Sequence, residues 1–194
     1  MLALDVATAA SITGTISAVT GTSQPTVAFR LVDQIGRPLK GLRASTIQFT
    51  AVKLVAGANG GSSRWVSYIN ANAAATQATT PVSSWGTAAT RQATAEGAGT
   101  AGGTFVDNGD GTYTYRFAKD LGAYTAQDDP GPGPAVAFEG GLTHRIGFEI
   151  RGTGLNATNN PVYTYVPATG ATTALPLQRD IVNTAECAAC HDRL

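Results

Sequence analysis

Apolar and polar residues alternate with a period of two in several stretches of the chain. The clearest case is residues 26–32, in which the apolar residues Val27, Phe29 and Leu31 occupy alternate positions. Successive side chains of a strand point to opposite faces, so this pattern predicts a half-buried β-strand. The same reasoning, applied to weaker patterns, predicts further strands at residues 11–18, 46–55, 64–69, 104–106, 112–117, 142–151 and 162–166.

Local signals refine two of these strands. Within residues 46–55 the apolar positions change parity between Phe49 and Val52, which predicts a β-bulge near Ala51. Residues 107–111 contain an Asn-Gly and an Asp-Gly dipeptide, which favour the positive φ angles of tight turns. The strands that flank this turn are therefore expected to form a β-hairpin.

Two stretches lack any strand pattern. Residues 71–103 consist mainly of Ala, Thr, Gly and Ser, with Trp85 as the sole aromatic residue, and predict a long loop that Trp85 pins to the domain. Residues 128–134 are two Asp residues followed by alternating Pro and Gly, which excludes a helix or a central strand.

Together these patterns predict an all-β fold of about eight strands, an Ig-like or Greek-key sandwich or split barrel. Residues 1–23 are expected to be a lead-in that includes the weak first strand. Residues 24–178 form the predicted β-domain, and no helix is predicted before residue 184.

Composition and charge exclude several function classes. The chain has 194 residues, of which 13 are basic and 13 acidic, so its formal net charge is zero. The sequence contains no run of basic residues of the kind that would indicate nucleic-acid binding. No apolar run approaches the roughly 18 residues of a membrane-spanning helix. Residues 1–20 lack the basic and apolar regions of a signal peptide, so none is predicted in this chain.

The candidate chemistry lies at residues 187–191, Cys-Ala-Ala-Cys-His. C-x-x-C-H is the signature of covalent c-type haem attachment. On a helix, Cys187 and Cys190 share a face and can bond to both vinyl groups of one porphyrin, while His191 serves as the proximal iron ligand. Asn183 is a suitable N-cap with Glu186 three residues later, so a short helix over residues 184–193 is predicted.

Other uses of these side chains stay open. A zinc site would have to combine Cys187, Cys190 and His191 with the distant His144, and the adjacency of Cys190 and His191 suits one tetrahedral ion poorly. A thioredoxin-like pair would need a βαβ context, which the pattern does not contain. Two unmodified thiols are the remaining alternative. His144 is a candidate distal haem ligand, or else a histidine hydrogen-bonded within the β-domain.

Other catalytic or metal-binding patterns are missing from the sequence. There is no G-x-S-x-G elbow and no P-loop. Calcium binding at the acidic turn is not predicted, because Gly109 and Gly111 occupy two of the alternate positions that would supply side-chain oxygens. An electron-transfer protein is therefore expected rather than an enzyme that turns over a substrate. A haem-dependent catalyst with an open coordination position opposite His191 is the remaining enzyme hypothesis.

Several stretches together resemble a known family. They are TVAFRLVDQIGRPLKGL, IQFTAVKLV, WVSYIN, FVDNGDGTYTYRF, LTHRIGFEIRG and RDIVNTAECAACH, in that order. This combination, from Gln24 to His191, is similar to the N-terminal part of the OmcA/MtrC family of outer-membrane multihaem cytochromes. The hairpin stretch by itself is also typical of Ig-like adhesin domains, so an Ig-like adhesion or binding module with incidental cysteines is the alternative.

The resemblance implies a function. Such proteins alternate β-domains with multihaem domains on the outer surface of the outer membrane, and they transfer respiratory electrons to metal oxides, metal complexes or flavins. The family's haem motif corresponds to Cys187, Cys190 and His191, with one haem c in this chain. The implied partners are a downstream haem domain, which would start within residues 179–194, and an outer-membrane porin–cytochrome complex. The chain is accordingly expected to be exported and to be the front part of a longer protein.

Overall fold

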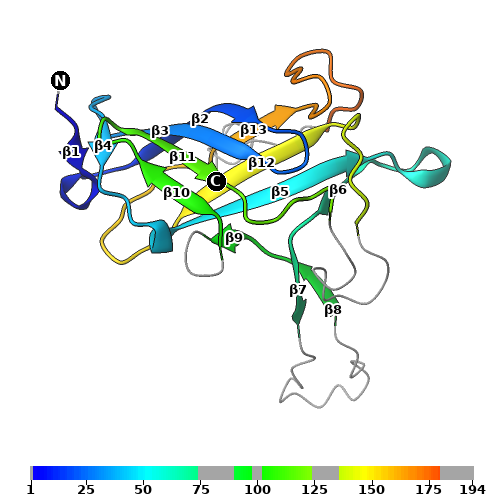
Figure 1. Cartoon of the computed structure of the whole chain (residues 1–194), viewed down its shortest axis with the longest axis horizontal. Coiled ribbons are helices and arrows are strands. Elements are labelled where there is room, and N and C mark those ends of the chain that lie inside the picture. Colours follow the sequence, from blue (N-terminus) through cyan, green and yellow to red (C-terminus); the bar gives the residue numbers. More distant parts are fainter. Residues whose placement is uncertain (1, 74–89, 98–101, 124–135, 180–194) are drawn as a thin grey trace, which may run out of the picture.

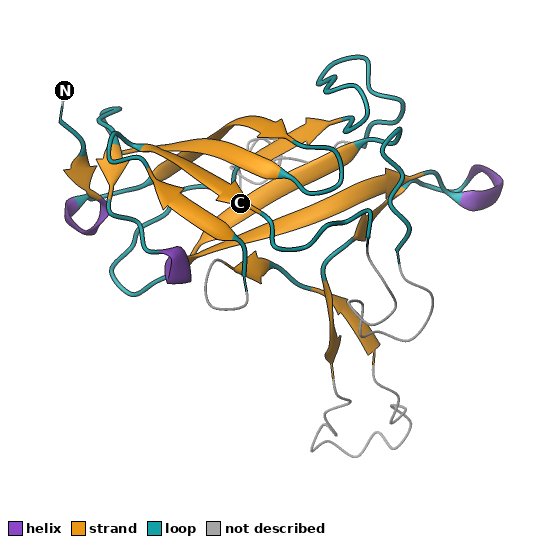
Figure 2. Cartoon of the chain, in the orientation of Figure 1, coloured by secondary structure: helices purple, strands orange, loops and turns teal. Residues whose placement is uncertain are grey.

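A computed structural model of the chain describes residues 2–73, 90–97, 102–123 and 136–179. In these residues the fold is all-β, as predicted, with thirteen strands and only short 3₁₀ turns between them (Figures 1 and 2). The predicted helix over residues 184–193 lies outside the described residues. Two antiparallel sheets dominate the fold, and their strands do not close into a barrel in the described part of the chain.

The first sheet has the strand order β10-β11-β3-β2. Its strands are β2 (Thr13–Thr20), β3 (Thr26–Val32), β10 (Thr104–Asp107) and β11 (Thr112–Arg116). The predicted hairpin is confirmed, because β10 and β11 pair antiparallel and Gly109 and Gly111 have φ angles of 79° and 92°. A register shift between Ile16 and Ala18 interrupts the pairing of β2 with β3.

The second sheet has the strand order β13-β12-β5-β6, and β9 also pairs with β5. Its strands are β5 (Ile47–Val55), β6 (Arg64–Ser67), β9 (Glu96–Gly97), β12 (His144–Ile150) and β13 (Val162–Tyr165).

The prediction of a β-bulge near Ala51 was wrong. Pairing between β5 and β12 is continuous from Ile47 opposite Ile150 to Lys53 opposite His144. Lys53 is buried at the same parity as Ile47 and Ala51, so the strand keeps its phase with a lysine at the position where an apolar residue was expected.

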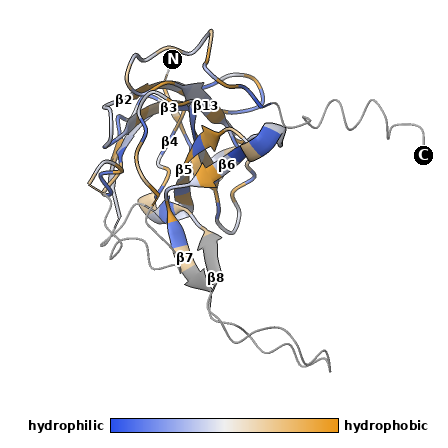
Figure 3. Cartoon of the chain, turned by 90° about the vertical axis from the view of Figure 1, so that its right-hand side faces the viewer, coloured by the Kyte–Doolittle hydropathy of each residue, from blue (hydrophilic) through white to orange (hydrophobic). Residues whose placement is uncertain are grey.

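Four short strands lie outside the two sheets. β1 (Leu4–Asp5) pairs parallel with β4 (Leu39–Lys40), and β7 (Asn70–Ala73) pairs antiparallel with β8 (Thr90–Ala93). The β7–β8 ribbon extends away from the two sheets (Figures 1 and 3). The stretch 71–103, predicted as a loop, therefore contains strand residues, and the proposed anchor Trp85 lies outside the described residues. Three 3₁₀ turns complete the fold at Val6–Thr8, Ala44–Thr46 and Ala58–Gly60.

Aromatic side chains fill the space between the two sheets. Phe29 of β3 contacts Phe148 of β12, with ring centroids 4.7 Å apart. Phe49 of β5 stacks on Tyr115 of β11 at 4.0 Å with nearly parallel rings. All four side chains occupy the parity that the alternation assigns to the core, and all four are buried. The predicted strand faces are thus confirmed, and the fold is a β-sandwich held by an aromatic core.

Candidate functional site

The predicted haem-attachment residues Cys187, Cys190 and His191 lie outside the described residues. Their side chains can still be compared with the donors that a c-type haem requires. Two thiols three positions apart, with an imidazole directly after the second, are the donor set that c-type haem requires. Cys187 and Cys190 would hold the haem and His191 would ligate its iron.

Residues 171–179, which lead to this motif, are anchored to the second sheet. The Thr143 hydroxyl donates a hydrogen bond of 2.6 Å to the Leu177 carbonyl and lies 3.3 Å from the Leu177 amide nitrogen, which donates to it. The Val166 amide donates to the Ala171 carbonyl at 2.9 Å. The chain therefore runs beside the beginning of β12 and the end of β13 before it continues toward the haem motif.

His144 lies at the beginning of β12 and is only 2% exposed. Its Nδ1 is 2.8 Å from the Leu142 carbonyl, and its Nε2 is 2.7 Å from the Tyr68 hydroxyl. A carbonyl oxygen can only accept, so Nδ1 carries the proton and Nε2 accepts from Tyr68 in the neutral ring. Both ring nitrogens therefore have partners within the β-domain.

These contacts bear on the candidate distal-ligand role of His144. Ligation of an iron through Nε2 would break the hydrogen bond with Tyr68, whose ring stacks on the imidazole with centroids 5.5 Å apart. Burial lowers the pKa of His144 from its ordinary value, and the nearby Lys53 charge lowers it further. The surroundings of His144 therefore favour a structural role for a neutral imidazole.

Lys53 contributes a buried charge to the same region. Lys53 is 5% exposed. Its Nζ donates hydrogen bonds to the Ala137 carbonyl at 2.6 Å and to the Glu139 carboxylate at 2.5 Å. The Glu139 side chain is 53% exposed, so the pair connects the buried ammonium group with the surface. Buried charges need such partners. The sequence signal for this pair was a lysine at the apolar parity of β5, which instead led to the bulge prediction.

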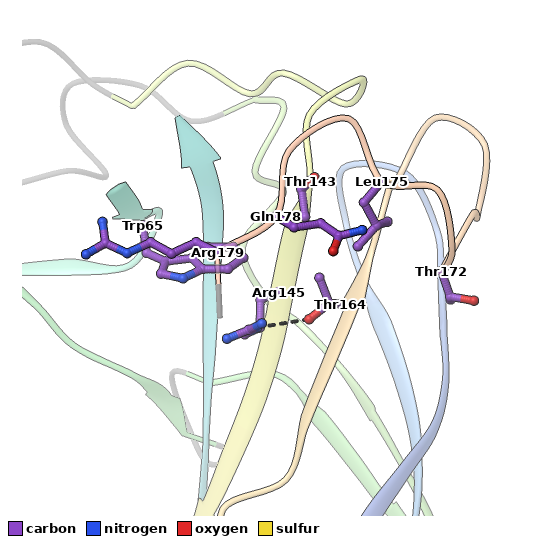
Figure 4. A pocket seen from close by; sticks show the side chains of 8 residues that line it. All are labelled: Trp65, Thr143, Arg145, Thr164, Thr172, Leu175, Gln178 and Arg179. Atoms are coloured by element: carbon purple, nitrogen blue, oxygen red, sulfur yellow. Dashed lines mark hydrogen bonds between the residues drawn. The ribbon is translucent and has the colours of Figure 1, made fainter. Parts of the chain in front are cut away.

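A pocket of about 210 Å³ opens beside the strand starts of β12 and β6 (Figure 4). Arg145 reaches into it from β12, where its Nε donates to the Thr164 hydroxyl at 2.9 Å and its guanidinium lies 4.5 Å from the centre of the Trp65 ring. Arg179 lines the same pocket. Sequence reasoning missed this site, because its residues come from strands far apart in the chain. The one available signal was the alternation in β12, which places Arg145 on the face opposite to Ile146.

Other site types find no support in the described ranges. Residues 2–73, 90–97, 102–123 and 136–179 contain no group of three or more His, Cys, Asp or Glu side chains that could hold a metal ion. The Asp110 carboxylate accepts from the Thr112 amide and hydroxyl and thus serves the hairpin turn. In the same ranges no helix has the length and apolar character needed to cross a membrane.

The chain was compared with known proteins. Residues 19–172 match the OmcA-like N-terminal domain. The crystal structure of the outer membrane decahaem cytochrome OmcA superposes with a TM-score of 0.77 and 21% identity, covering 96% of this chain and 27% of OmcA. MtrC from Shewanella baltica OS185 superposes with a TM-score of 0.64 and 22% identity, covering 93% of this chain and 26% of MtrC.

The comparison with curated proteins finds no match. At these identities the two structures show a shared fold, and the chain spans about a quarter of the length of each. The family match extends over most of the β-sandwich and stops shortly before the C-x-x-C-H motif. This chain therefore belongs to the OmcA-like N-terminal domain family.

Proposed function

We propose that this chain is the N-terminal β-domain and first haem-attachment site of an extracellular multihaem c-type cytochrome. The whole protein would transfer respiratory electrons to extracellular acceptors such as metal oxides, metal complexes or flavins. The observation that carries this proposal is the order of two features: an OmcA-like N-terminal domain over residues 19–172, and then C-x-x-C-H at residues 187–191.

Each part of the chain has a distinct role in this proposal. Cys187 and Cys190 hold the haem by thioether bonds, and His191 occupies the proximal position on the iron. The bound haem supplies one-electron redox chemistry. The β-sandwich is the scaffold, which packs on the downstream haem domain and fixes the direction in which residues 171–179 leave its surface. An exported protein at the outer-membrane surface, in contact with a porin–cytochrome complex, fits this role.

A haem-attachment experiment tests the proposal. We would produce the full chain in a host with c-type cytochrome maturation machinery and measure its intact mass and absorbance. The expected result is a covalent adduct of one haem with a Soret band. The double variant Cys187→Ser, Cys190→Ser is the matched control and should carry no covalent haem. A wild-type chain that matures without covalent haem would refute the assignment.

Electron transfer is tested on the same sample. The haem-loaded chain is reduced, freed of reductant and mixed with a soluble ferric complex or a flavin in a stopped-flow spectrometer. We expect reoxidation of the haem that depends on acceptor concentration. A reduced chain that stays reduced in excess acceptor would contradict the proposed activity while leaving the haem attachment intact.

A further inference from the structure

The buried tyrosines of the β-sandwich differ in the group that accepts a hydrogen bond from their hydroxyl. Tyr68, Tyr113 and Tyr115 are each fully buried. A backbone carbonyl accepts from Tyr113 at 2.9 Å, and the Glu96 carboxylate accepts from Tyr115 at 2.7 Å. Tyr68 instead donates to Nε2 of His144 at 2.7 Å. A carbonyl is not a base at neutral pH, and a carboxylate is ordinarily a weaker base than an imidazole. Tyr68 therefore has the partner that is best able to take up a whole proton.

The tautomer of His144 prepares Nε2 to receive that proton. The Nδ1–H group donates to the Leu142 carbonyl at 2.8 Å, which leaves a lone pair on Nε2 facing the Tyr68 hydroxyl. Burial raises the pKa of the Tyr68 phenol and lowers the pKa of the His144 imidazole, so the proton stays on the phenol oxygen at rest. The resting pair is a neutral phenol hydrogen-bonded to a neutral imidazole.

Removal of one electron from Tyr68 reverses this preference. A tyrosine radical cation is a strong acid, so it transfers its proton even to an imidazole whose pKa is lowered. The electron passes to an oxidant, the O–H bond of Tyr68 breaks, and an N–H bond forms at Nε2 of His144. The products are a neutral tyrosyl radical and an imidazolium, and re-reduction by one electron returns the proton along the same hydrogen bond. The oxidant must be a strong one-electron acceptor, such as a peroxide-derived radical or a ruthenium(III) polypyridyl complex.

The charges beside the pair favour this coupling of electron and proton. The Lys53 Nζ lies 5.8 Å from the centre of the Tyr68 ring. A positive charge at this position disfavours a radical cation on the ring, so the electron leaves more readily when the proton leaves with it. The Glu139 carboxylate accepts from the same Nζ at 2.5 Å. The new imidazolium of His144 therefore faces a compensated ion pair and not a lone ammonium group.

Aromatic rings connect the pair with the surface. The Tyr165 ring lies 6.2 Å from the His144 ring, and the Tyr163 ring lies 5.9 Å from the Tyr165 ring, measured between centroids. Tyr165 is buried, whereas Tyr163 is half-buried and reaches solvent. Rings at these separations allow short electron-transfer steps. An oxidant that touches Tyr163 can therefore withdraw an electron from the buried pair without entering the fold.

We propose that Tyr68 and His144 form a proton-coupled redox pair, which gives an electron through Tyr165 and Tyr163 to a strong one-electron oxidant at the surface. The pair holds the oxidising equivalent as a neutral radical that water cannot reach. This activity uses side chains of the β-domain alone and does not depend on the proposed haem attachment. Its substrates are oxidising radicals that meet the surface of the domain.

The test uses the full chain with Cys187→Ser, Cys190→Ser and His191→Ala, which carries no haem. A light flash in the presence of a ruthenium(II) tris-bipyridine complex and persulfate generates the ruthenium(III) oxidant, and the sample is then frozen. Electron paramagnetic resonance should detect a long-lived tyrosyl radical. We expect its loss in Tyr68→Phe and its retention in the matched control Tyr113→Phe, because the Tyr113 hydroxyl faces a carbonyl that cannot accept the proton.

The role of His144 is measured on the same chain labelled with ¹⁵N-histidine. The chain has two histidines, so His191→Ala leaves His144 as the single labelled ring. Electron–nuclear double resonance should show coupling of the radical to a ring nitrogen. The variant His144→Gln offers Tyr68 an amide in place of a base and should abolish the radical. Circular dichroism shows whether each variant is folded.

Each outcome decides one part of the proposal. A radical of equal yield in Tyr68→Phe overturns the assignment to Tyr68. Absence of coupling to the histidine nitrogen overturns His144 as the proton acceptor, even if His144→Gln does not fold, and so does a radical that survives in a folded His144→Gln chain. Radical formation that is equally fast in Tyr163→Phe overturns the surface route. Haem attachment is measured separately by mass on the wild-type chain, so failure of this proposal and failure of the proposed function are distinguishable.

Discussion

The contact between Tyr68 and His144 offers a sharp test of the buried polar region of the β-sandwich. The variant Tyr68→Phe removes only the hydroxyl oxygen and keeps the ring that stacks on the imidazole. His144 would retain the bond from Nδ1 to the Leu142 carbonyl, while Nε2 would lose the donor now 2.7 Å away. The change therefore removes the hydrogen bond of this hydroxyl with His144, together with its interaction with the Glu139 backbone, and leaves the ring packing in place.

The size of the effect follows from burial. Tyr68 is fully buried and His144 is 2% exposed, so water cannot replace the lost donor at Nε2. A buried acceptor left without a partner costs about 1–3 kcal/mol of unfolding free energy. For a domain of this size, that corresponds to a fall in Tm of about 2–4 °C for each kcal/mol.

Urea unfolding of the apo chain at pH 8, followed by circular dichroism, measures this loss. Tyr163→Phe is the matched control, because the Tyr163 side chain makes a ring contact with Tyr165 and its hydroxyl has no hydrogen bond among the described residues. The control should stay within about 0.5 kcal/mol of wild type. Equal unfolding midpoints for Tyr68→Phe and wild type would refute the argument that this hydrogen bond satisfies a buried imidazole.

Three further predictions concern the same domain. Burial lowers the pKa of His144 in the folded state, so the unfolded state binds more protons than the folded state once the pH falls below the ordinary histidine pKa of about 6.5. The unfolding free energy should therefore be constant from pH 8 to about 6.5 and fall toward pH 5. This fall should be less steep in His144→Gln. Phe49→Ala removes the ring stacked on Tyr115 between the sheets and should cost about 3–5 kcal/mol in urea unfolding, whereas a cost below 1 kcal/mol would contradict the packed aromatic core. Glu96→Ala removes the carboxylate that accepts from the Tyr115 hydroxyl and the Ala118 amide, each at 2.7 Å, and should cost about 1–3 kcal/mol; hydrogen exchange at the Ala118 amide should speed up, and unchanged exchange would argue against this anchor.

Much of the sandwich could be predicted from the order of the residues alone. The period-two alternation identified β3, β11 and β12 and the face that each one buries, and the glycines at 109 and 111 identified the hairpin between β10 and β11. These signals are local: a strand shows its buried face through its own side chains, and a tight turn needs particular residues at particular positions. The C-x-x-C-H spacing is local in the same sense, so the haem hypothesis required no tertiary information.

Short strands without apolar alternation were not predictable in this way. β7 and β8 consist of Asn-Ala-Asn-Ala and Thr-Arg-Gln-Ala, and β9 has two residues, so their own side chains do not indicate a buried face. Their strand conformation depends on hydrogen bonds to a partner strand. Pairing partners that are distant in sequence leave no periodic signal in a single chain.

The tertiary structure alone decided which polar residues meet. Lys53 broke the apolar pattern of β5 and suggested a bulge, yet the fold buries it beside Glu139 because a lysine with two acceptors can occupy a core position. His144 is paired with Tyr68, 76 residues away, and Arg145 of β12 meets Trp65 of β6, although β5 lies between these two strands in the sheet. The sequence by itself determined the strands with apolar alternation, their buried faces and the haem motif, because each depends on neighbouring residues. The partners of His144, Lys53 and Arg145 depend on how the sheets pair, and only the folded chain brings those side chains together.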